Sequence, residues 1–170
     1  MKDVPGFRYT DAVLHADEVP VTQIAAATGT PTYVYSATAI RAAYKRLRDA
    51  FSPLGMRFRY AIKASPNSHL CRLMHEQGAG MDVVSGGDYA RAIAAGVPGE
   101  RIVFSGVGKT GDEIRAALSG GIRQFNVESE PEMAVINEVA LELGVVAPIT
   151  VRVNPDVDAK THAKIATGKS

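Results

Sequence analysis

Apolar side chains occupy every second position of a short stretch near the middle of the chain. Within residues 57–63, Phe58, Tyr60 and Ile62 alternate with smaller or more polar residues. A period of two predicts a β-strand, because successive side chains of a strand point to opposite faces. A Ser-Pro-Asn sequence follows and is expected to end the strand, since proline breaks the hydrogen-bond ladder. Lys63 is therefore predicted at the carboxyl end of a strand.

The same strand–helix unit recurs as far as residue 155. Strands are predicted at residues 57–63, 81–85, 101–105, 122–128 and 148–154, and helices at 68–77, 87–95, 111–119 and 130–143. This alternation is typical of a parallel sheet with helices packed outside it. We predict an α/β fold, an incomplete (β/α)8 TIM barrel with about five strands, because eight strands need about 250 residues. Five strands cannot close, so the isolated chain is expected to be inactive and prone to aggregation.

The first 35 residues do not follow this alternation and are treated as a separate segment, 1–35, before the barrel part, 36–170. Short extended pieces are expected at residues 7–9 and 13–15, a helix from Pro20 to Gly29, and a β-rich stretch at 32–35. Ser36 is a favourable N-cap for a helix that runs to about Phe51. Residues 155–170 lack periodicity and are expected to form an exposed, mobile loop.

The composition is that of an ordinary globular protein, and it argues against several classes of partner and against a membrane span. The chain has 170 residues, 46% hydrophobic and 22% charged, with a net charge of +1. Near neutrality gives no electrostatic reason to expect nucleic acid or an anionic membrane surface as a partner. No apolar run approaches the 18 or so residues of a membrane span. Cys71 is a single cysteine, which fits a reducing cytoplasm and a role as core filler.

Polar residues collect on one face of the predicted sheet, while the other face is apolar. This polar set contains Lys63, Asp82, Asn126, Glu128, Arg152 and Asn154. Buried polar groups are costly unless they satisfy one another, so the set predicts a barrel lumen with a site at its mouth. A lysine that loses solvation there presents a neutral amine, which can form an imine with an aldehyde. A purely structural ion pair between Asp82 and Arg152 stays open as an alternative.

A glycine-rich loop gives a weaker signal. Gly106-Val107-Gly108-Lys109-Thr110 resembles the end of a phosphate-binding loop, but the first glycine of that motif is replaced by Val103. We interpret these glycines as turn residues and Lys109 as a solvated loop residue. Gly86-Gly87 opens a helix and is likewise interpreted as a tight turn in preference to an anion site.

The four histidines do not form a recognisable centre. They are His15, His69, His75 and His162. His69 and His75 are six residues apart, a spacing that does not align two ligands on one helical face. We expect solvated or capping roles for the histidines and no metal site.

Several motifs together resemble one known superfamily. They are Tyr60-Ala-Ile-Lys63-Ala, Met81-Asp82-Val-Val-Ser-Gly-Gly, Arg101-Ile-Val-Phe-Ser-Gly-Val-Gly-Lys-Thr, Phe125-Asn-Val-Glu-Ser and Val151-Arg152-Val-Asn-Pro-Asp-Val-Asp-Ala-Lys-Thr-His. Residues 30–170 resemble the pyridoxal-phosphate decarboxylases of fold type III, which have an alanine-racemase-like barrel. The stretch 154–168 is most similar to the diaminopimelate decarboxylase branch. Ala64-Ser65-Pro66-Asn67 departs from the family, in which many members have Ala-Asn-Ser-Asn.

The resemblance implies specific roles for three residues. Lys63 would hold pyridoxal 5'-phosphate as an internal aldimine, and Asp82 and Arg152 would lie beside the cofactor. On charge grounds, Asp82 is expected to stabilise protonated Lys63, and Arg152 to hold Asp82 in place. The resemblance also implies that the other cofactor-binding residues lie in the second half of the barrel. Segment 1–35 would belong to a β-domain, and the protein would be a homodimer with shared active sites.

The function implied is decarboxylation of meso-diaminopimelate to L-lysine and carbon dioxide in the cytoplasm. Three alternatives stay open. The first is a sibling decarboxylase of another basic amino acid or a carboxylated polyamine. The second is a non-catalytic pyridoxal-phosphate carrier with a single barrel domain. The third is a phosphate-binding module at residues 106–110, which Val103 disfavours.

Overall fold

The computed structural model describes residues 4–154, in two sheets and six α-helices. In chain order the elements are β1 (Phe7–Thr10), β2 (Val13–Ala16), β3 (Val19–Pro20), α1 (Val21–Thr28), α2 (Ala37–Phe51), η1 (Ser52–Leu54), β4 (Arg59–Ala61), η2 (Ile62–Ala64), α3 (Ser68–Glu76), β5 (Gly80–Val83), α4 (Gly86–Ala94), η3 (Gly99–Arg101), β6 (Ile102–Phe104), α5 (Gly111–Ser119), β7 (Gln124–Val127), α6 (Glu130–Leu143) and β8 (Ile149–Val151). The predicted terminal loop, with His162, lies outside the described residues.

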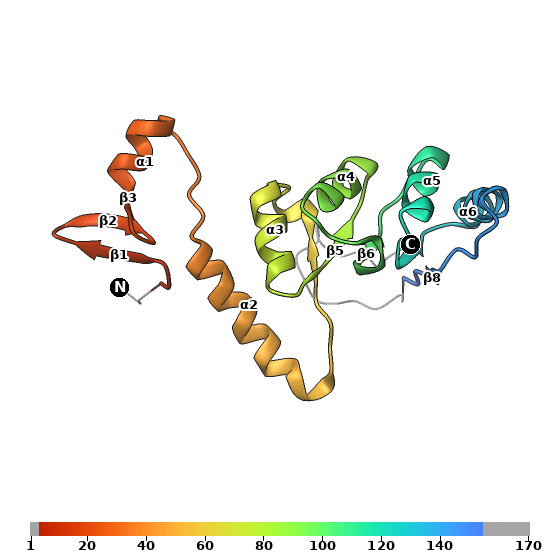
Figure 1. The fold of residues 1–170 in the computed structure, drawn as a ribbon, viewed down its shortest axis with the longest axis horizontal. Helices are drawn as coiled ribbons and strands as arrows, with labels where there is room; N and C mark the ends of the chain where they lie inside the picture. The colour runs from red at the N-terminus through yellow and green to blue at the C-terminus, as the bar shows by residue number, and fades with distance from the viewer. Residues whose placement is uncertain (1–3, 155–170) are drawn as a thin grey trace.

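Strands β4 to β8 form one sheet in sequential order, and all four neighbouring pairs are parallel. Each of the strands β4 to β7 is followed by a helix that returns the chain to the starting edge of the sheet (Figure 1). The predicted α/β class and five strands are confirmed. The strands are shorter than predicted, and the first spans Arg59–Ala61 instead of residues 57–63. Pairing with the neighbouring strand decides where each strand begins and ends, and the periodicity of the sequence does not reveal this pairing.

The core lies between this sheet and helices α3 to α6. Phe104 on β6 and Phe125 on β7 are fully buried, and their rings stack with centroids 5.9 Å apart. Ile62, Met81 and Ile114 are also fully buried in this core. Burying a side chain of this size stabilises the fold by about 1.5–3 kcal/mol. The apolar face predicted to meet the helices is therefore confirmed.

Three of the helices that follow strands of the sheet begin with the same kind of N-cap. The N-cap side chains of Ser85, Thr110 and Ser129 accept hydrogen bonds from the backbone N–H three residues later. These bonds satisfy donors that have no partner inside a helix. Since the helices α4, α5 and α6 follow parallel strands, their capped ends lie at the carboxyl edge of the sheet.

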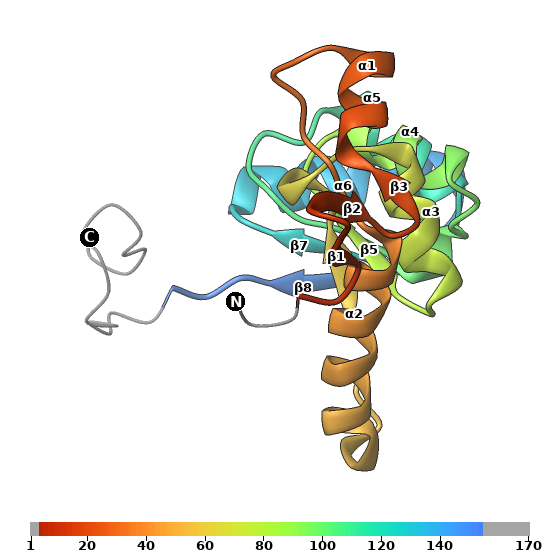
Figure 2. The same cartoon turned by 90° about the vertical axis from the view of Figure 1, so that its left-hand side faces the viewer.

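The N-terminal part forms a unit of its own. Strands β1, β2 and β3 make an antiparallel sheet beside α1, and α2 connects this unit to the larger sheet (Figures 1 and 2). Ser36 Oγ donates to Asp17 Oδ1 at 2.7 Å, and its N-cap role for α2 is as predicted. The stretch 32–35 belongs to neither sheet, and its Tyr33 is 90% exposed. Strand-favouring residues need a paired neighbour, and this stretch has none within the described residues.

Among residues 4–154, none of the helices combines the length and the apolar character needed to cross a lipid bilayer.

Candidate functional site

The carboxyl ends of the five parallel strands meet at one edge of the sheet. Lys63 follows β4, Asp82 lies in β5, and Ser105 follows β6. Glu128 follows β7 and Arg152 follows β8. Strand ends at this edge are where (β/α) barrels place their sites. The sequence-predicted residues Lys63, Asp82 and Arg152 therefore share an edge, at the carboxyl ends of three different strands.

Lys63 lies in a tight turn just beyond β4. The strand ends at Ala61, and a single 3-10 turn spans Ile62–Ala64. Ser65 N donates to Ile62 O at 3.0 Å, and Tyr60 Oη donates to Ser65 O at 3.1 Å, so both ends of the turn are fixed. Burial raises the pKa of Tyr60, which therefore stays a hydrogen-bond donor at neutral pH.

The lysine side chain is exposed, and the predicted loss of solvation is therefore wrong for this structure. The reason is its position: Ile62 points into the core and is fully buried, while Lys63 comes one residue later in the turn. The amine is accessible, as binding of an aldehyde requires.

A chain of three hydrogen bonds crosses the polar face of the sheet. Gln124 Nε2 donates to Asn126 Oδ1 at 3.0 Å, and Asn126 Nδ2 donates to Ser105 Oγ at 2.9 Å. Ser105 Oγ in turn donates to Asp82 Oδ1 at 2.5 Å. Asp82 is half-buried between fully buried Met81 and Val83, so alternation places it on the face away from the core.

The hydrogen bond from Ser105 holds the Asp82 carboxylate in a fixed orientation. Asp82 pairs in register with Ala61, so it lies beside β4. The predicted polar face is confirmed at Asp82 and Asn126.

Arg152 pairs with Glu128 and not with Asp82. Its Nη1 lies 3.0 Å from Glu128 Oε2 and 3.2 Å from Glu128 Oε1. The predicted contact between Asp82 and Arg152 is not formed among the described residues. Asp82 on β5 and Arg152 after β8 are three strand spacings apart, about 14 Å along the sheet. Glu128 directly follows β7, the strand next to β8, and is much closer.

Lys109 is buried, which contradicts its interpretation as a solvated loop residue. Its side chain is 0% exposed, and Nζ lies 2.6 Å from Glu132 Oε1. Nζ also donates to Gly106 O at 2.7 Å and to Asn126 O at 2.9 Å. The sequence pattern around a loop does not show that a lysine turns inward, because two of its three acceptors, on Asn126 and Glu132, come from other segments.

The glycines near these loops are turn residues, as interpreted from the sequence. Gly106 and Gly108 have φ angles of +89° and +77°, a region that favours glycine. Gly86 N donates to Glu113 Oε1 at 2.6 Å, so this N–H already binds a carboxylate of the chain itself.

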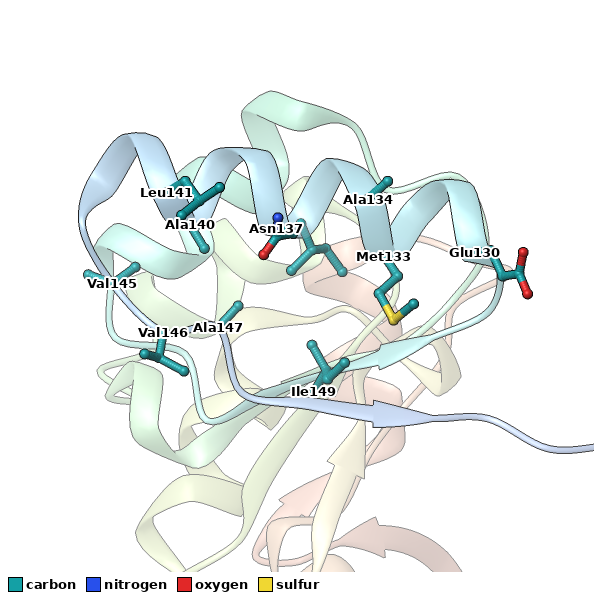
Figure 3. Close-up of a pocket in the computed structure, with 11 residues that line it drawn as sticks. Glu130, Met133, Ala134, Asn137, Ala140, Leu141, Val145, Val146, Ala147 and Ile149 are labelled. Carbon is teal, nitrogen blue, oxygen red and sulfur yellow. The ribbon is translucent and has the colours of Figure 1, made fainter.

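A groove lies away from these strand ends. It is apolar, has a volume of about 610 Å³, and lies between α6 and residues 145–149 (Figure 3). Met133, Leu141 and Ile149 are among its lining residues. Its lining residues include none of the candidate site residues, and nothing within residues 4–154 shows what covers it.

The structure is thus a parallel (β/α) unit with a lysine and an oriented carboxylate at the carboxyl edge of its sheet. Residues 37–170 match the family described as "Pyridoxal-dependent decarboxylase, pyridoxal binding domain". The chain belongs to this family. The resemblance inferred from the motifs is thereby confirmed, and with it the pyridoxal cofactor.

Named relatives narrow the similarity further. The chain is 48% identical over 162 residues to a diaminopimelate decarboxylase of Pseudomonas aeruginosa, and the alignment covers 95% of this chain and 39% of that protein. It is 48% identical over 164 residues to a diaminopimelate decarboxylase of Aquifex aeolicus, covering 96% of this chain and 39% of that protein. The chain thus spans about two fifths of the length of these relatives.

Solved structures share the fold. The diaminopimelate decarboxylase of M. jannaschii in complex with L-lysine superposes with a TM-score of 0.85 at 40% identity, covering 94% of this chain and 38% of that chain. A lysine/ornithine decarboxylase from Vibrio vulnificus superposes with a TM-score of 0.69 at 22% identity, covering 78% of this chain and 35% of that chain. The second similarity shows the fold alone.

Sequence reasoning missed Ser105, Glu132 and the inward position of Lys109. Glu132 carries a local signal, because Ser129 and Glu132 have the spacing of a capping box. Ser105 carries none, since its partners Asp82 and Asn126 are 23 and 21 residues away.

Proposed function

We propose that the complete protein is a pyridoxal-phosphate-dependent decarboxylase that converts meso-diaminopimelate to L-lysine and carbon dioxide. The observation that carries this proposal is the exposed amine of Lys63 beside the strand that holds Asp82, in a chain of the pyridoxal-binding family. When bound, the cofactor supplies an electron sink for the electrons left by the departing carboxylate.

The residues present fit this cofactor. Lys63 offers an accessible primary amine for the aldehyde carbon, and the turn Ile62–Ala64 fixes where that amine starts. Asp82 offers a carboxylate oriented by Ser105, which favours the ammonium form of a lysine that has been released. Asn126 supports Ser105 from the next strand.

Arg152 takes a role different from the one expected from the sequence. Glu128 accepts both of its hydrogen bonds, so Arg152 does not hold Asp82. The Arg152 side chain remains 48% exposed at the same edge. It therefore offers a guanidinium of fixed position to an anionic group of the cofactor or substrate.

The choice of substrate rests on the relatives. Those with 46–48% identity are named diaminopimelate decarboxylase, whereas the lysine/ornithine decarboxylase is 22% identical. A sibling decarboxylase is the alternative. Carbon dioxide release from meso-diaminopimelate, L-lysine, L-ornithine and L-arginine by the complete gene product separates the two. Fastest release from a substrate other than meso-diaminopimelate would overturn the substrate assignment.

The lysine assignment has a test that needs no activity. Borohydride reduction of the complete gene product with pyridoxal phosphate, followed by peptide mass spectrometry, is expected to place the label on Lys63. Lys63→Ala should remove the label. Lys45→Ala is the matched control and should keep it, because Lys45 is an exposed lysine paired with Asp49 on α2. Labelling that survives in Lys63→Ala contradicts the assignment.

Three further features belong to the same proposal. Segment 1–35 contributes to a second domain, as supported by its own sheet and by a family match that begins at residue 37. The resemblance supports a homodimer with shared sites, which light scattering of the complete gene product tests. The single cysteine supports a cytoplasmic location, which a fluorescent fusion tests.

A further inference from the structure

Lys109 is a fully buried cation that the proposed chemistry does not use. Its Nζ donates to three oxygens: Gly106 O, Asn126 O and Glu132 Oε1, at 2.7, 2.9 and 2.6 Å. It also lies 5.7 Å from the centroid of the Phe104 ring. All three protons of the ammonium group therefore have an acceptor.

These acceptors come from three separate segments at the carboxyl edge of the sheet. Gly106 lies in the loop between β6 and α5, Asn126 lies in β7, and Glu132 lies in the first turn of α6. One buried amine thus ties together the loop after β6, the end of β7 and the start of α6.

Two further hydrogen bonds connect the groups that Lys109 binds to Glu128. Glu132 uses its second oxygen, Oε2, to accept the backbone N–H of Glu128 at 2.6 Å. Gly106, whose carbonyl binds Lys109, donates its own N–H to Glu128 Oε1 at 3.2 Å. The backbone and the carboxylate of Glu128 are therefore both held by groups that Lys109 binds.

Glu128 in turn holds Arg152, through the two contacts of Nη1 described above. We propose that Lys109 is a positioning residue: acting through Gly106, Glu132 and Glu128, it fixes the guanidinium of Arg152 at the edge of the site. The catalytic consequence of this inference rests on the proposed function. Its structural consequence, the position of the Arg152 guanidinium, rests on the geometry alone.

If Lys109 had a purely structural role, its replacement would change the stability of the fold and leave the position of Arg152 unchanged. Replacing both members of a buried ion pair by apolar side chains often costs no stability, so packing alone does not require the Lys109–Glu132 pair. An exposed ion pair lies nearby in the sequence, in which Arg115 on α5 meets Glu142 near the end of α6. That pair makes none of the contacts to Glu128 and supplies a matched control.

The structural arm measures Arg152 directly in the complete gene product. Nitrogen-15 NMR of arginine side chains follows the Arg152 Nε–Hε signal, assigned by its loss in Arg152→Lys. The signal is expected to shift in Lys109→Met and in Glu132→Gln, and to stay in Arg115→Met. Glu132→Gln keeps the shape of the side chain and serves where Lys109→Met fails to fold. A signal that stays unmoved in the folded Lys109 or Glu132 variant overturns the proposal.

The kinetic arm is a double-mutant cycle on kcat/KM for decarboxylation. Lys109→Met is expected to lower kcat/KM about tenfold when Arg152 is present and less than about twofold in Arg152→Met. Equal losses in both backgrounds overturn the proposal, because Lys109 would then not act through Arg152. If the complete gene product releases no carbon dioxide from any amino acid, the proposed function fails, and the NMR arm alone decides the positioning role.

Discussion

Glu113 joins two successive strand–helix units by accepting the backbone N–H of Gly86 at 2.6 Å. Its other carboxylate oxygen accepts the N–H of Thr110 at 2.9 Å, which completes the capping box of α5. Hydrogen bonds from Thr110 and then from Gly86 lower the pKa of Glu113 below its usual value. A single carboxylate therefore stabilises the starts of both α4 and α5.

The first prediction concerns the pH dependence of this contact. Because the pKa of Glu113 is lower in the folded state, its carboxylate stabilises the fold above the unfolded pKa of about 4.3, and this contribution is lost as the pH falls through the folded pKa. Glu113→Gln is expected to lower the free energy of unfolding by about 1 kcal/mol at pH 7 and by less at acidic pH.

Urea unfolding of both proteins between pH 3 and pH 7 measures this difference. The exposed Glu138, in the middle of α6, gives a control variant, Glu138→Gln, expected within about 0.5 kcal/mol of the parent. A difference for Glu113→Gln that does not change with pH contradicts the prediction.

The second prediction concerns a close backbone approach at Gly80. A Cβ at this position would lie 2.4 Å from the backbone oxygen of Arg101, which cannot move without disturbing β6. Gly80→Ala is therefore expected to destabilise the protein by about 1–3 kcal/mol. Gly111→Ala, at the first position of α5 with nothing within 4 Å, should be neutral or slightly stabilising. Thermal melting of the two variants checks this, and equal melting temperatures would refute it.

The third prediction concerns Ser105, which connects Asp82 to Asn126. Ser105→Ala removes one donor and one acceptor from a half-buried network. We expect the free energy of unfolding to fall by about 1–3 kcal/mol. The affinity for pyridoxal phosphate is expected to fall several-fold, because the Asp82 carboxylate loses its fixed orientation. Ser119→Ala, at the exposed end of α5, is the control. Unchanged unfolding and unchanged cofactor titration in Ser105→Ala would show that the network does not matter.

The fourth prediction concerns the thiol of Cys71, which is 0% exposed. Burial, and then the nearby negative charge of Asp88, raise the pKa of this thiol. Since the thiolate is the reactive form, Cys71 is expected to react with a disulfide reagent only as fast as the protein opens. A cysteine introduced by Ala116→Cys on the exposed side of α5 should react immediately. Rapid reaction of one thiol in the folded parent protein would contradict this expectation.

The helices show how far local sequence carries the prediction. Helices predicted at residues 111–119 and 130–143 have those bounds in the structure. Their ends depend on neighbours in the sequence, such as the Thr110–Glu113 capping box and Gly144 after α6. Strand ends are less accurate, because a strand continues only as far as the adjacent strand provides partners.

The amino-acid order alone established the repeating strand–helix unit, the apolar face toward the helices and the place of Lys63 after the first strand of the sheet. Side-chain period and helix caps encode these features within a few residues. The tertiary structure alone decided that Arg152 pairs with Glu128 and that Lys109 turns inward to Glu132. These partners are 24 and 23 residues apart, so strand order and register bring them together, and no local pattern records that.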